Sequence, residues 1–296
     1  MTPSGAQWQA LASAIADQCG TRIKPASATA VSGGCIHTAL KVDTSDGPLF
    51  LKLNDASMAD NLAAERTGLD ALAASNTLRV PRPLGTGESQ GIAWLAMEWL
   101  DLTTAGGSEA SHRLGLGLAA LHAAPAQRFG FDSDNVIGAS PQPNGWCDTW
   151  PSFVRKHRIQ FQLELAACNG FRGELQAAGK ALLERLDGWS AAHIRPALQH
   201  GDLWGGNWGV IAGGEPVVFD PAVFYGDPEA DIAMTRLFGG FDKAFYDAYR
   251  SVHPNPEDGE FRRQLYALYH VLNHLNLFGG GYLGQALTLL RKLVQT

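Results

Sequence analysis

Residues 198–207, LQHGDLWGGN, give the strongest indication of the fold of this chain. It places Asp202 and Asn207 at the separation found in the H-R-D-x-x-x-x-N loop of phosphoryl-transfer catalysis. In that loop the Asp accepts the proton of the attacking hydroxyl, and the Asn holds magnesium. The apolar run at 217–219 then ends at Asp220, where a second magnesium ligand is needed. The sequence therefore predicts Asp202 as the catalytic residue and Asn207 and Asp220 as metal ligands, against the alternative of an ordinary polar loop.

The first half of the chain carries a lysine and a glutamate in the order that such a loop requires. Residues 49–53 form an apolar run interrupted by Lys52, which predicts a buried strand offering one ammonium group. Residues 57–74 have helical periodicity with Glu65 near the middle. A Lys52–Glu65 ion pair would direct the ammonium toward the α and β phosphates of ATP. Taken alone, Lys52 could equally protect a strand edge and Glu65 could lie on a solvated helix face.

A turn in the first half is the candidate for covering the phosphates. Residues 26–31 and 36–43 have extended patterns, and the turn between them contains Gly33, Gly34 and Cys35. Two glycines can bring backbone N–H groups close to phosphate oxygens, and such a site also favours a thiolate at Cys35. The pattern G-x-G-x-x-G is absent, and the segment alone is equally typical of a plain hairpin.

Residues 92–100 read as a buried strand that runs into a connector between two lobes. In kinase-like folds the backbone of that connector pairs with the edge of adenine, and flat apolar side chains sandwich the ring. We therefore expect Met97, Glu98 and Trp99 to contribute to nucleotide binding. Without its position in the chain, the same segment would be no more than a core strand.

Together these elements predict an α+β, protein-kinase-like two-lobed fold. Residues 1–97 are expected to form a small nucleotide-binding lobe with an antiparallel sheet and one main helix, and residues 98–296 a larger, mostly helical lobe for catalysis and substrate binding. Residues 129–144 are rich in Pro, Gly and Asn and read as irregular. Further helices are expected near residues 8–18, 112–124, 150–168 and 174–189, and from about Glu229, Asp242, Gly259 and Tyr282 onward.

Composition agrees with a soluble two-lobed enzyme. The 296 residues suffice for a sizeable core, and the net charge of −6 argues against a nucleic-acid binder, which would carry a basic stripe. No apolar run approaches the length of a membrane helix, and the N-terminus does not resemble an export signal. Four scattered cysteines without C-x-x-C spacing are typical of reduced thiols. We therefore expect a cytoplasmic protein without nucleic-acid or membrane partners.

The segment after Asp220 indicates the kind of phosphate acceptor. Only ten residues separate Asp220 from Asp231, too few for a loop that docks a protein substrate, so a small molecule or a modified side chain is expected. Carboxylates gather at residues 225–231, which would favour a cationic substrate. For Asp227, which precedes Pro228, capping of a helix is the stronger alternative. Asp231 is expected to brace the catalytic loop.

Three other features have structural alternatives that we prefer. Trp204 in the catalytic loop could stack on the substrate, but a tryptophan there more often serves packing. His270 and His274, four positions apart, could share a metal, but no third ligand is suggested nearby. The basic run at 155–158 reads as a solvated helix face.

The chain resembles the fructosamine kinases (fructosamine/ketosamine 3-kinases), within the aminoglycoside-phosphotransferase-like group. The resemblance covers nearly the whole chain and rests on the runs HGDLWGGN at 200–207, DPA at 220–222, YGD at 225–227, EAD at 229–231, LFGGF at 237–241 and LNHLNLFGGGY at 272–282. It implies magnesium- and ATP-dependent phosphorylation of the sugar 3-hydroxyl of a ketosamine, the adduct of a sugar such as fructose or ribulose with an amine. The 3-phosphate then falls away and frees the amine. The substrate would be a small ketosamine or a glycated lysine of a protein, and the enzyme a monomer or homodimer.

Two other functions stay open. One is an aminoglycoside- or choline-type phosphotransferase of the same fold, against which the run ending at Tyr282 argues. The other is a non-catalytic nucleotide-binding protein, against which the joint presence of the predicted catalytic, metal and lysine positions argues.

Overall fold

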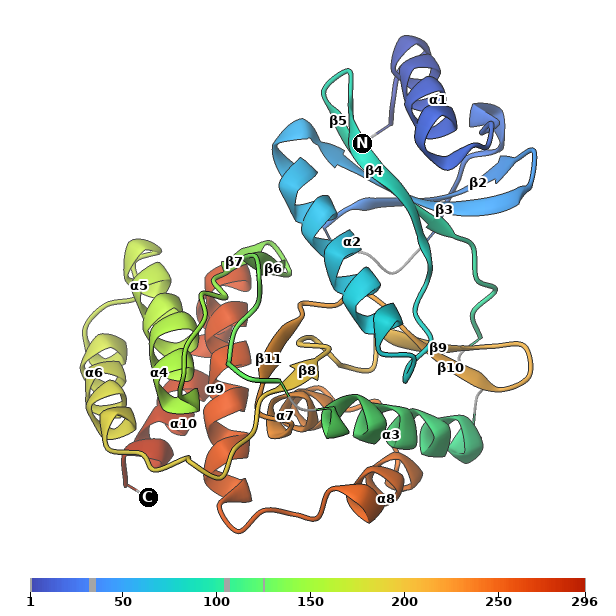
Figure 1. Cartoon of the computed structure of the whole chain (residues 1–296). Helices are drawn as coiled ribbons and strands as arrows, with labels where there is room; N and C mark the ends of the chain where they lie inside the picture. The colour runs from blue at the N-terminus through green and yellow to red at the C-terminus, as the bar shows by residue number, and fades with distance from the viewer. Residues whose placement is uncertain (1, 32–35, 104–106, 125, 296) are drawn as a thin grey trace. The chain divides into compact units, whose positions relative to one another are not determined.

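The computed structural model describes residues 2–31, 36–103, 107–124 and 126–295 (Figure 1). The chain divides into two compact units. Unit 1 comprises Met1–Ala110 and Trp208–Asp220, and unit 2 comprises Ser111–Asn207 and Pro221–Thr296. The expected functional boundary after residue 97 stays a prediction. Among the described residues, no helix combines the length and the apolar character that crossing a bilayer demands.

Unit 1 is built on an antiparallel sheet of five strands in the order β1-β2-β3-β5-β4 (Figure 1). The strands are β1 Thr29–Ala30, β2 Thr38–Thr44, β3 Gly47–Asp55, β4 Pro83–Ser89 and β5 Ile92–Glu98. The helices are α1 Gly5–Cys19 and α2 Ala59–Ala74, and a hairpin of β9 Trp208–Ile211 and β10 Glu215–Val218 completes the unit.

Alternation along β3 separates the two faces of this sheet. Leu51 and Leu53 are fully buried in a core that includes Leu11 and Ile15 of α1. Successive side chains of a strand point to opposite faces, so Lys52 lies on the face away from that core. The period-two pattern thus places one polar group on the face opposite to α1, and β3 is the predicted strand that offers one ammonium group.

Unit 2 is mostly helical (Figure 1). Its helices are the larger part of α3 Gly107–Ala123, from Ser111 onward, and α4 Trp150–Val154, α5 Phe161–Cys168, α6 Glu174–Asp187, α7 Glu229–Leu237, α8 Lys243–Val252, α9 Gly259–Phe278 and α10 Leu283–Gln295. A π-helical segment, Arg155–Gln160, joins α4 to α5. Two short antiparallel pairs are β6 Asn135–Ile137 with β7 Ser140–Gln142, and β8 Ala197–Gln199 with β11 Phe224–Gly226.

The α+β class, the antiparallel sheet and the helical C-terminal part are confirmed. Two local expectations were wrong. The segment 129–144 contains the β6–β7 pair and is not wholly irregular. The basic run at 155–158 is not a solvated face, since His157 and Arg158 are buried. An α-helical period does not predict this burial, because the π-helical turn at Arg155–Gln160 changes the direction in which successive side chains point.

Candidate functional site

In unit 1, the ammonium group of Lys52 is shared by two carboxylates. Its Nζ lies 2.7 Å from Oε1 of Glu65 on α2 and 2.6 Å from Oδ1 of Asp220. The Lys52 and Glu65 side chains are 8% and 10% exposed, whereas that of Asp220 is 43% exposed. The predicted Lys52–Glu65 pair is therefore confirmed, and Asp220 is the partner that solvent or a ligand can reach.

Electrostatics keep this lysine charged. Burial alone would lower the pKa of Lys52, but attraction to Asp220 and Glu65 outweighs burial and raises it. Burial raises the pKa of Glu65, and the nearby negative charge of Asp220 adds to this while Lys52 opposes it. One ammonium thus holds two carboxylates, and an incoming anion would have to compete with one of them.

Asp220 is also held in an unusual backbone conformation. Its φ of 56° lies in the left-handed region, which Asp tolerates better than most residues. It follows β10, whose Val218 N–H donates to the carbonyl of Arg79 at 2.9 Å. The expected short strand is therefore present as β10, although it ends at Val218, two residues before Asp220, and the backbone turn presents the carboxylate to Lys52.

The three expected adenine-binding residues lie at the end of β5 with different neighbours. Met97 is 3% exposed and pairs with Phe50 across the sheet. The Glu98 carboxylate lies 2.7 Å from the Arg79 guanidinium and accepts the Arg82 N–H at 2.6 Å. Glu98 therefore ties β5 to the residues before β4, and a nucleotide contact at either position stays a prediction.

Trp99 has its own set of neighbours in unit 1. The indole N–H donates to Asp101 at 2.6 Å, and the ring stacks on Phe50 at 6.3 Å between centroids. The Lys41 ammonium lies 4.4 Å from the ring centroid. These contacts hold the indole in place, and its stacking on adenine stays a prediction. Gly33, Gly34 and Cys35 lie outside the described residues.

In unit 2, the catalytic loop follows β8 and is braced by Asp231 of α7. The two carboxylate oxygens of Asp231 each accept one backbone N–H, from His200 and from Gly201, both at 2.8 Å. Gly201 has a φ of +83°, and a Cβ there would lie 2.0 Å from the carbonyl oxygen of Ala222. Only glycine fits this close approach, which accounts for its place in the HGD motif.

Asp202 and Asn207 are joined within this loop. The Asn207 amide nitrogen donates to the Asp202 carbonyl at 2.9 Å and to Oδ2 of Asp202 at 3.2 Å. Asn207 is buried and Asp202 is partly exposed. The expected spacing therefore produces a real contact, in which the amide nitrogen orients the carboxylate and the amide oxygen is directed elsewhere.

The brace at Asp231 is itself embedded in a buried network. His122 Nε2 lies 3.2 Å from its carboxylate, and His122 Nδ1 lies 2.9 Å from the Tyr249 hydroxyl. Burial raises the pKa of Asp231, but hydrogen bonds and the nearby histidines outweigh burial and hold it below its usual range. Asp231 is therefore ionised at neutral pH, and its bracing role, which the sequence suggested, is borne out by these contacts.

The other carboxylates of this segment are not available to a cationic substrate. Asp227 is 1% exposed; it lies 3.1 Å from Nε of Arg262, is hydrogen-bonded by Tyr266, and accepts the Glu229 N–H at 3.0 Å. The Glu229 carboxylate is buried too and binds the Arg250 guanidinium through both oxygens, at 2.6 and 2.8 Å. This geometry favours the capping alternative for Asp227, and the argument from charge complementarity loses its basis.

Arg158 was missed by sequence reasoning. Its guanidinium carbon lies 4.5 Å from the ring centroid of Phe153 and 4.4 Å from that of Phe224, and its NH2 group donates to Asn144 at 2.8 Å. Burial lowers its pKa to about 10, with Tyr269 and Asp134 opposing, so it remains charged at pH 7. Sequence reasoning missed this cation because Phe224 and Tyr269, two of the rings that surround it, lie far along the chain.

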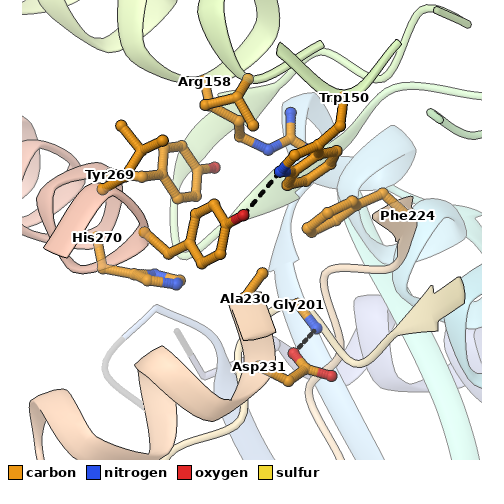
Figure 2. Close-up of a pocket in the computed structure, with 11 residues that line it drawn as sticks. Trp150, Arg158, Gly201, Phe224, Ala230, Asp231, Tyr269 and His270 are labelled. Carbon is orange, nitrogen blue, oxygen red and sulfur yellow. Dashed lines mark hydrogen bonds between the residues drawn. The ribbon is translucent and has the colours of Figure 1, made fainter. Parts of the chain in front are cut away.

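Arg158 also lines a small cavity that reaches the catalytic loop (Figure 2). Figure 2 shows Gly201 and Asp231 on one side of it, and His270 and Tyr269 on another. Its volume of about 20 Å³ admits roughly one water molecule and no sugar. The cavity therefore belongs to the support of the loop and is not a substrate pocket.

Trp204 is 39% exposed, next to glycines that approach other groups closely. A Cβ on Gly206 would lie 2.2 Å from the Trp204 ring, and one on Gly240 would lie 2.6 Å from the Cα of Gly205. The LFGGF run thus packs its backbone against the catalytic loop. An exposed indole on this loop can contact an acceptor, which stays a prediction.

His270 and His274 lie on α9 as expected, with His274 Nδ1 2.8 Å from the His270 carbonyl oxygen. Burial lowers the pKa of His270 to about 3. Within the described ranges, no three His, Cys, Asp or Glu side chains gather in a way that suits a metal ion.

Comparisons with known proteins agree on one family. The sequence profile of the family described as fructosamine kinase matches residues 7–296. A protein of Synechocystis sp. named as a probable ketoamine kinase is 43% identical over 293 residues, which cover 99% of this chain and 98% of that protein. A mouse protein named ketosamine-3-kinase is 36% identical over 289 residues, which cover 88% of this chain and 93% of that protein.

A solved structure extends the similarity to the fold. A protein of Haemophilus somnus 129PT, provisionally named fructosamine-3-kinase, matches with a TM-score of 0.87 at 27% identity, and the match covers 97% of each chain. The kinase fold expected from the sequence is therefore confirmed along almost the whole chain.

Proposed function

This chain belongs to the fructosamine kinase family, and on that premise we propose that it transfers the γ-phosphoryl group of ATP to the 3-hydroxyl of a ketosamine. The observation that carries the proposal is the buried Lys52 ammonium shared by Glu65 and Asp220. Because Asp220 is half-exposed, another anion can replace it beside the buried Lys52 ammonium. A nucleotide phosphate supplies the anion.

Lys52 binds the nucleotide phosphates while Glu65 keeps the ammonium oriented. A phosphate oxygen that approaches Lys52 takes the place of the Asp220 carboxylate, the more exposed of its two partners. Asp220 then becomes available as a ligand. The Glu65 contact, which is more shielded from solvent than the Asp220 contact, persists and fixes the direction of the ammonium.

Magnesium would be held by the Asp220 carboxylate and the Asn207 amide oxygen. The donor set fits: both are hard oxygen ligands, and the Asn207 amide nitrogen is already committed to Asp202. Magnesium bound with a nucleotide needs only one or two protein ligands, because phosphates and waters supply the others. When bound, the ion neutralises charge that develops on the phosphate oxygens.

Asp202 orients the 3-hydroxyl of the sugar and accepts its proton as the oxygen attacks the γ-phosphorus. The new bond joins this oxygen to phosphorus, and the bond to the β–γ bridging oxygen breaks, so that ADP leaves. Asn207 holds the Asp202 carboxylate in place, and Asp231 holds the backbone on its N-terminal side. Since the transition state is loose, this positioning matters more than the strength of the base.

The acceptor is a small ketosamine or a glycated lysine side chain, with Trp204 as a contact for the sugar or its amine substituent. The ketosamine 3-phosphate is unstable and releases the amine, so the reaction serves deglycation. We infer a cytoplasmic location, because the reaction consumes magnesium-ATP and because the scattered cysteines are expected to be reduced. The expected monomer or homodimer stays a prediction.

The first experiment is a substrate panel. The protein is incubated with magnesium-ATP and fructosyl-, ribulosyl- and erythrulosyl-amines, free fructose and aminoglycosides, and phosphorylated products are detected by mass spectrometry. We expect phosphorylated ketosamines and no product from the aminoglycosides. Phosphorylation of an aminoglycoside with all ketosamines untouched would overturn the assignment of the acceptor.

The matched variant is Asp202→Asn. Turnover should fall by about 10²–10⁴-fold, because the proton acceptor is lost, while the dissociation constant of magnesium-ADP stays close to that of the wild type. Turnover of Asp202→Asn near the wild-type rate would remove Asp202 from its proposed role. Asp220→Ala, in contrast to Asp202→Asn, should also weaken the binding of the magnesium-nucleotide complex.

A further inference from the structure

His37 is a residue of unit 1 whose proton position is determined by its neighbours. It immediately precedes β2, and its Nδ1 lies 2.9 Å from Nδ2 of Asn54 on β3. The Asn54 amide has one possible orientation: its oxygen accepts the Asp55 N–H at 2.8 Å, and its nitrogen donates to the Ile36 carbonyl at 3.1 Å. A flipped amide would lose both bonds and face like groups. Asn54 is therefore the donor and Nδ1 of His37 the acceptor.

The imidazole of His37 therefore has one N–H group to donate, at Nε2. Burial, and then the positive charge of Lys52, lower the pKa of His37 to about 4, with Asp220 opposing. At pH 7 the ring is uncharged, and because Nδ1 accepts, the proton is on Nε2. His37 thus presents one N–H group, directed away from Asn54.

The sheet register places this donor beside the lysine. Lys52 pairs with Ala39, and Leu53 with Thr38, so continuation of the register brings His37 opposite Asn54. His37 and Ala39 therefore share the face of Lys52, and His37 is the diagonal neighbour of the lysine, about 7–8 Å away along the sheet. Ala39, the residue directly opposite Lys52 on this face, carries only a methyl group. An anion held by the ammonium comes within reach of the Nε2–H group.

We propose that His37 is a further phosphate-binding residue, which donates its Nε2–H to a phosphate oxygen of the nucleotide held by Lys52. This inference rests on the proposed function, because the nucleotide is its ligand. Asn54 acts as the positioning residue, since it fixes both the tautomer and the ring direction. An uncharged donor next to a charged one adds a directional bond without adding a second cation to repel Lys52.

The test measures nucleotide binding, without turnover. Dissociation constants of adenosine, ADP and a non-hydrolysable ATP analogue are determined by calorimetry with magnesium for the wild type, His37→Leu and His37→Gln. His37→Leu should weaken ADP and the ATP analogue by about tenfold or more, the usual size for a lost hydrogen bond to a charged group, and leave adenosine unchanged. His37→Gln should recover most of the affinity, because its amide can place a donor where Nε2 was.

The outcomes separate this inference from the proposed function. If the wild type binds no nucleotide, the proposed function fails. If the wild type binds and His37→Leu binds ADP equally well, the inference is overturned and the function stands. Equal weakening of adenosine and ADP would show that His37 shapes the fold and does not bind phosphate, which also overturns it. His112→Leu, at an exposed histidine of α3, is the control, and melting temperatures check that each variant folds.

Discussion

At the residue scale, several buried charges of this chain make more than one hydrogen bond or ion pair. Lys52 holds two carboxylates, Asp231 holds two backbone N–H groups and a histidine, and Glu229 binds Arg250 through both oxygens. Desolvation of a charge is compensated only when such partners are in place. Removal of one member therefore leaves the others buried without compensation, and a single substitution should have a large effect.

Asp231→Asn is the sharpest case. An amide offers one acceptor oxygen, so one of the two N–H groups of the catalytic loop loses its partner, at a cost of about 1–3 kcal/mol in the free energy of unfolding. Because the loop positions Asp202, we also expect kcat to fall by about tenfold or more, while the dissociation constant of ADP changes little. Urea denaturation and steady-state kinetics measure the two effects.

The control for this substitution is Asp247→Asn on α8. Asp247 pairs with Lys243 on an exposed helix face, where a pair contributes no more than about 0.5 kcal/mol. The control should match the wild type in both measurements. If Asp231→Asn and Asp247→Asn are equally stable and equally active, the brace has no function.

At the element scale, glycines let α7 end against the catalytic loop. Gly239 and Gly240 follow α7 with φ values of +74° and +93°. A Cβ at Gly239 would meet nothing within 4 Å, whereas one at Gly240 would lie 2.6 Å from the Cα of Gly205. The two positions share the backbone strain and differ in the clash.

Gly239→Ala and Gly240→Ala therefore form a matched pair. Gly239→Ala should cost about 1–2 kcal/mol, the strain of a left-handed alanine. Gly240→Ala should cost more, and should also lower kcat, because the clash moves Gly205 in the loop that carries Asp202 and Asn207. Chemical denaturation and kcat are measured for both. Identical values for the pair would mean that the loop accommodates the added methyl group freely.

At the scale of the whole molecule, the buried His270 and the partly buried His37 make stability depend on pH. Burial lowers the pKa of His270 to about 3, and burial with the charge of Lys52 lowers that of His37 to about 4. Each is below the unfolded value near 6.5, so the unfolded chain binds a proton that the native chain excludes. Their contribution is fully present above pH 6.5 and is lost as pH falls toward 4.

The expected slope is about 1.4 kcal/mol per pH unit for each such histidine. His270→Leu should flatten the dependence by that amount between pH 6.5 and 4.5, as measured from urea denaturation at several pH values. The same substitution at the exposed His112 of α3 should leave the slope unchanged. A slope in His270→Leu as steep as in the wild type would contradict the assigned direction.

Features that depend on local spacing could be predicted from the amino-acid sequence. Lys52 interrupts the apolar pattern of a strand, and Glu65 lies in a segment with helical periodicity, so both could be assigned to their elements and predicted to pair. Asp202 and Asn207 lie five positions apart in one loop, and this spacing lets them contact each other. Gly201 and Asp220 follow in the same way, from the motif and from the end of an apolar run.

Which charges are buried, and which groups they contact, depends on how distant segments pack and could not be predicted from the sequence. Arg158 packs on the ring of Phe224, which is more than sixty positions away along the chain. Asn54 on β3 fixes the tautomer of His37, which precedes the neighbouring strand β2. In the sequence, Asp227 and Glu229 resemble part of an acidic surface, but in the structure they are buried in ion pairs with Arg262 and Arg250. Burial and charge pairing arise from residues brought together by folding, and the local pattern around either partner carries no record of the other.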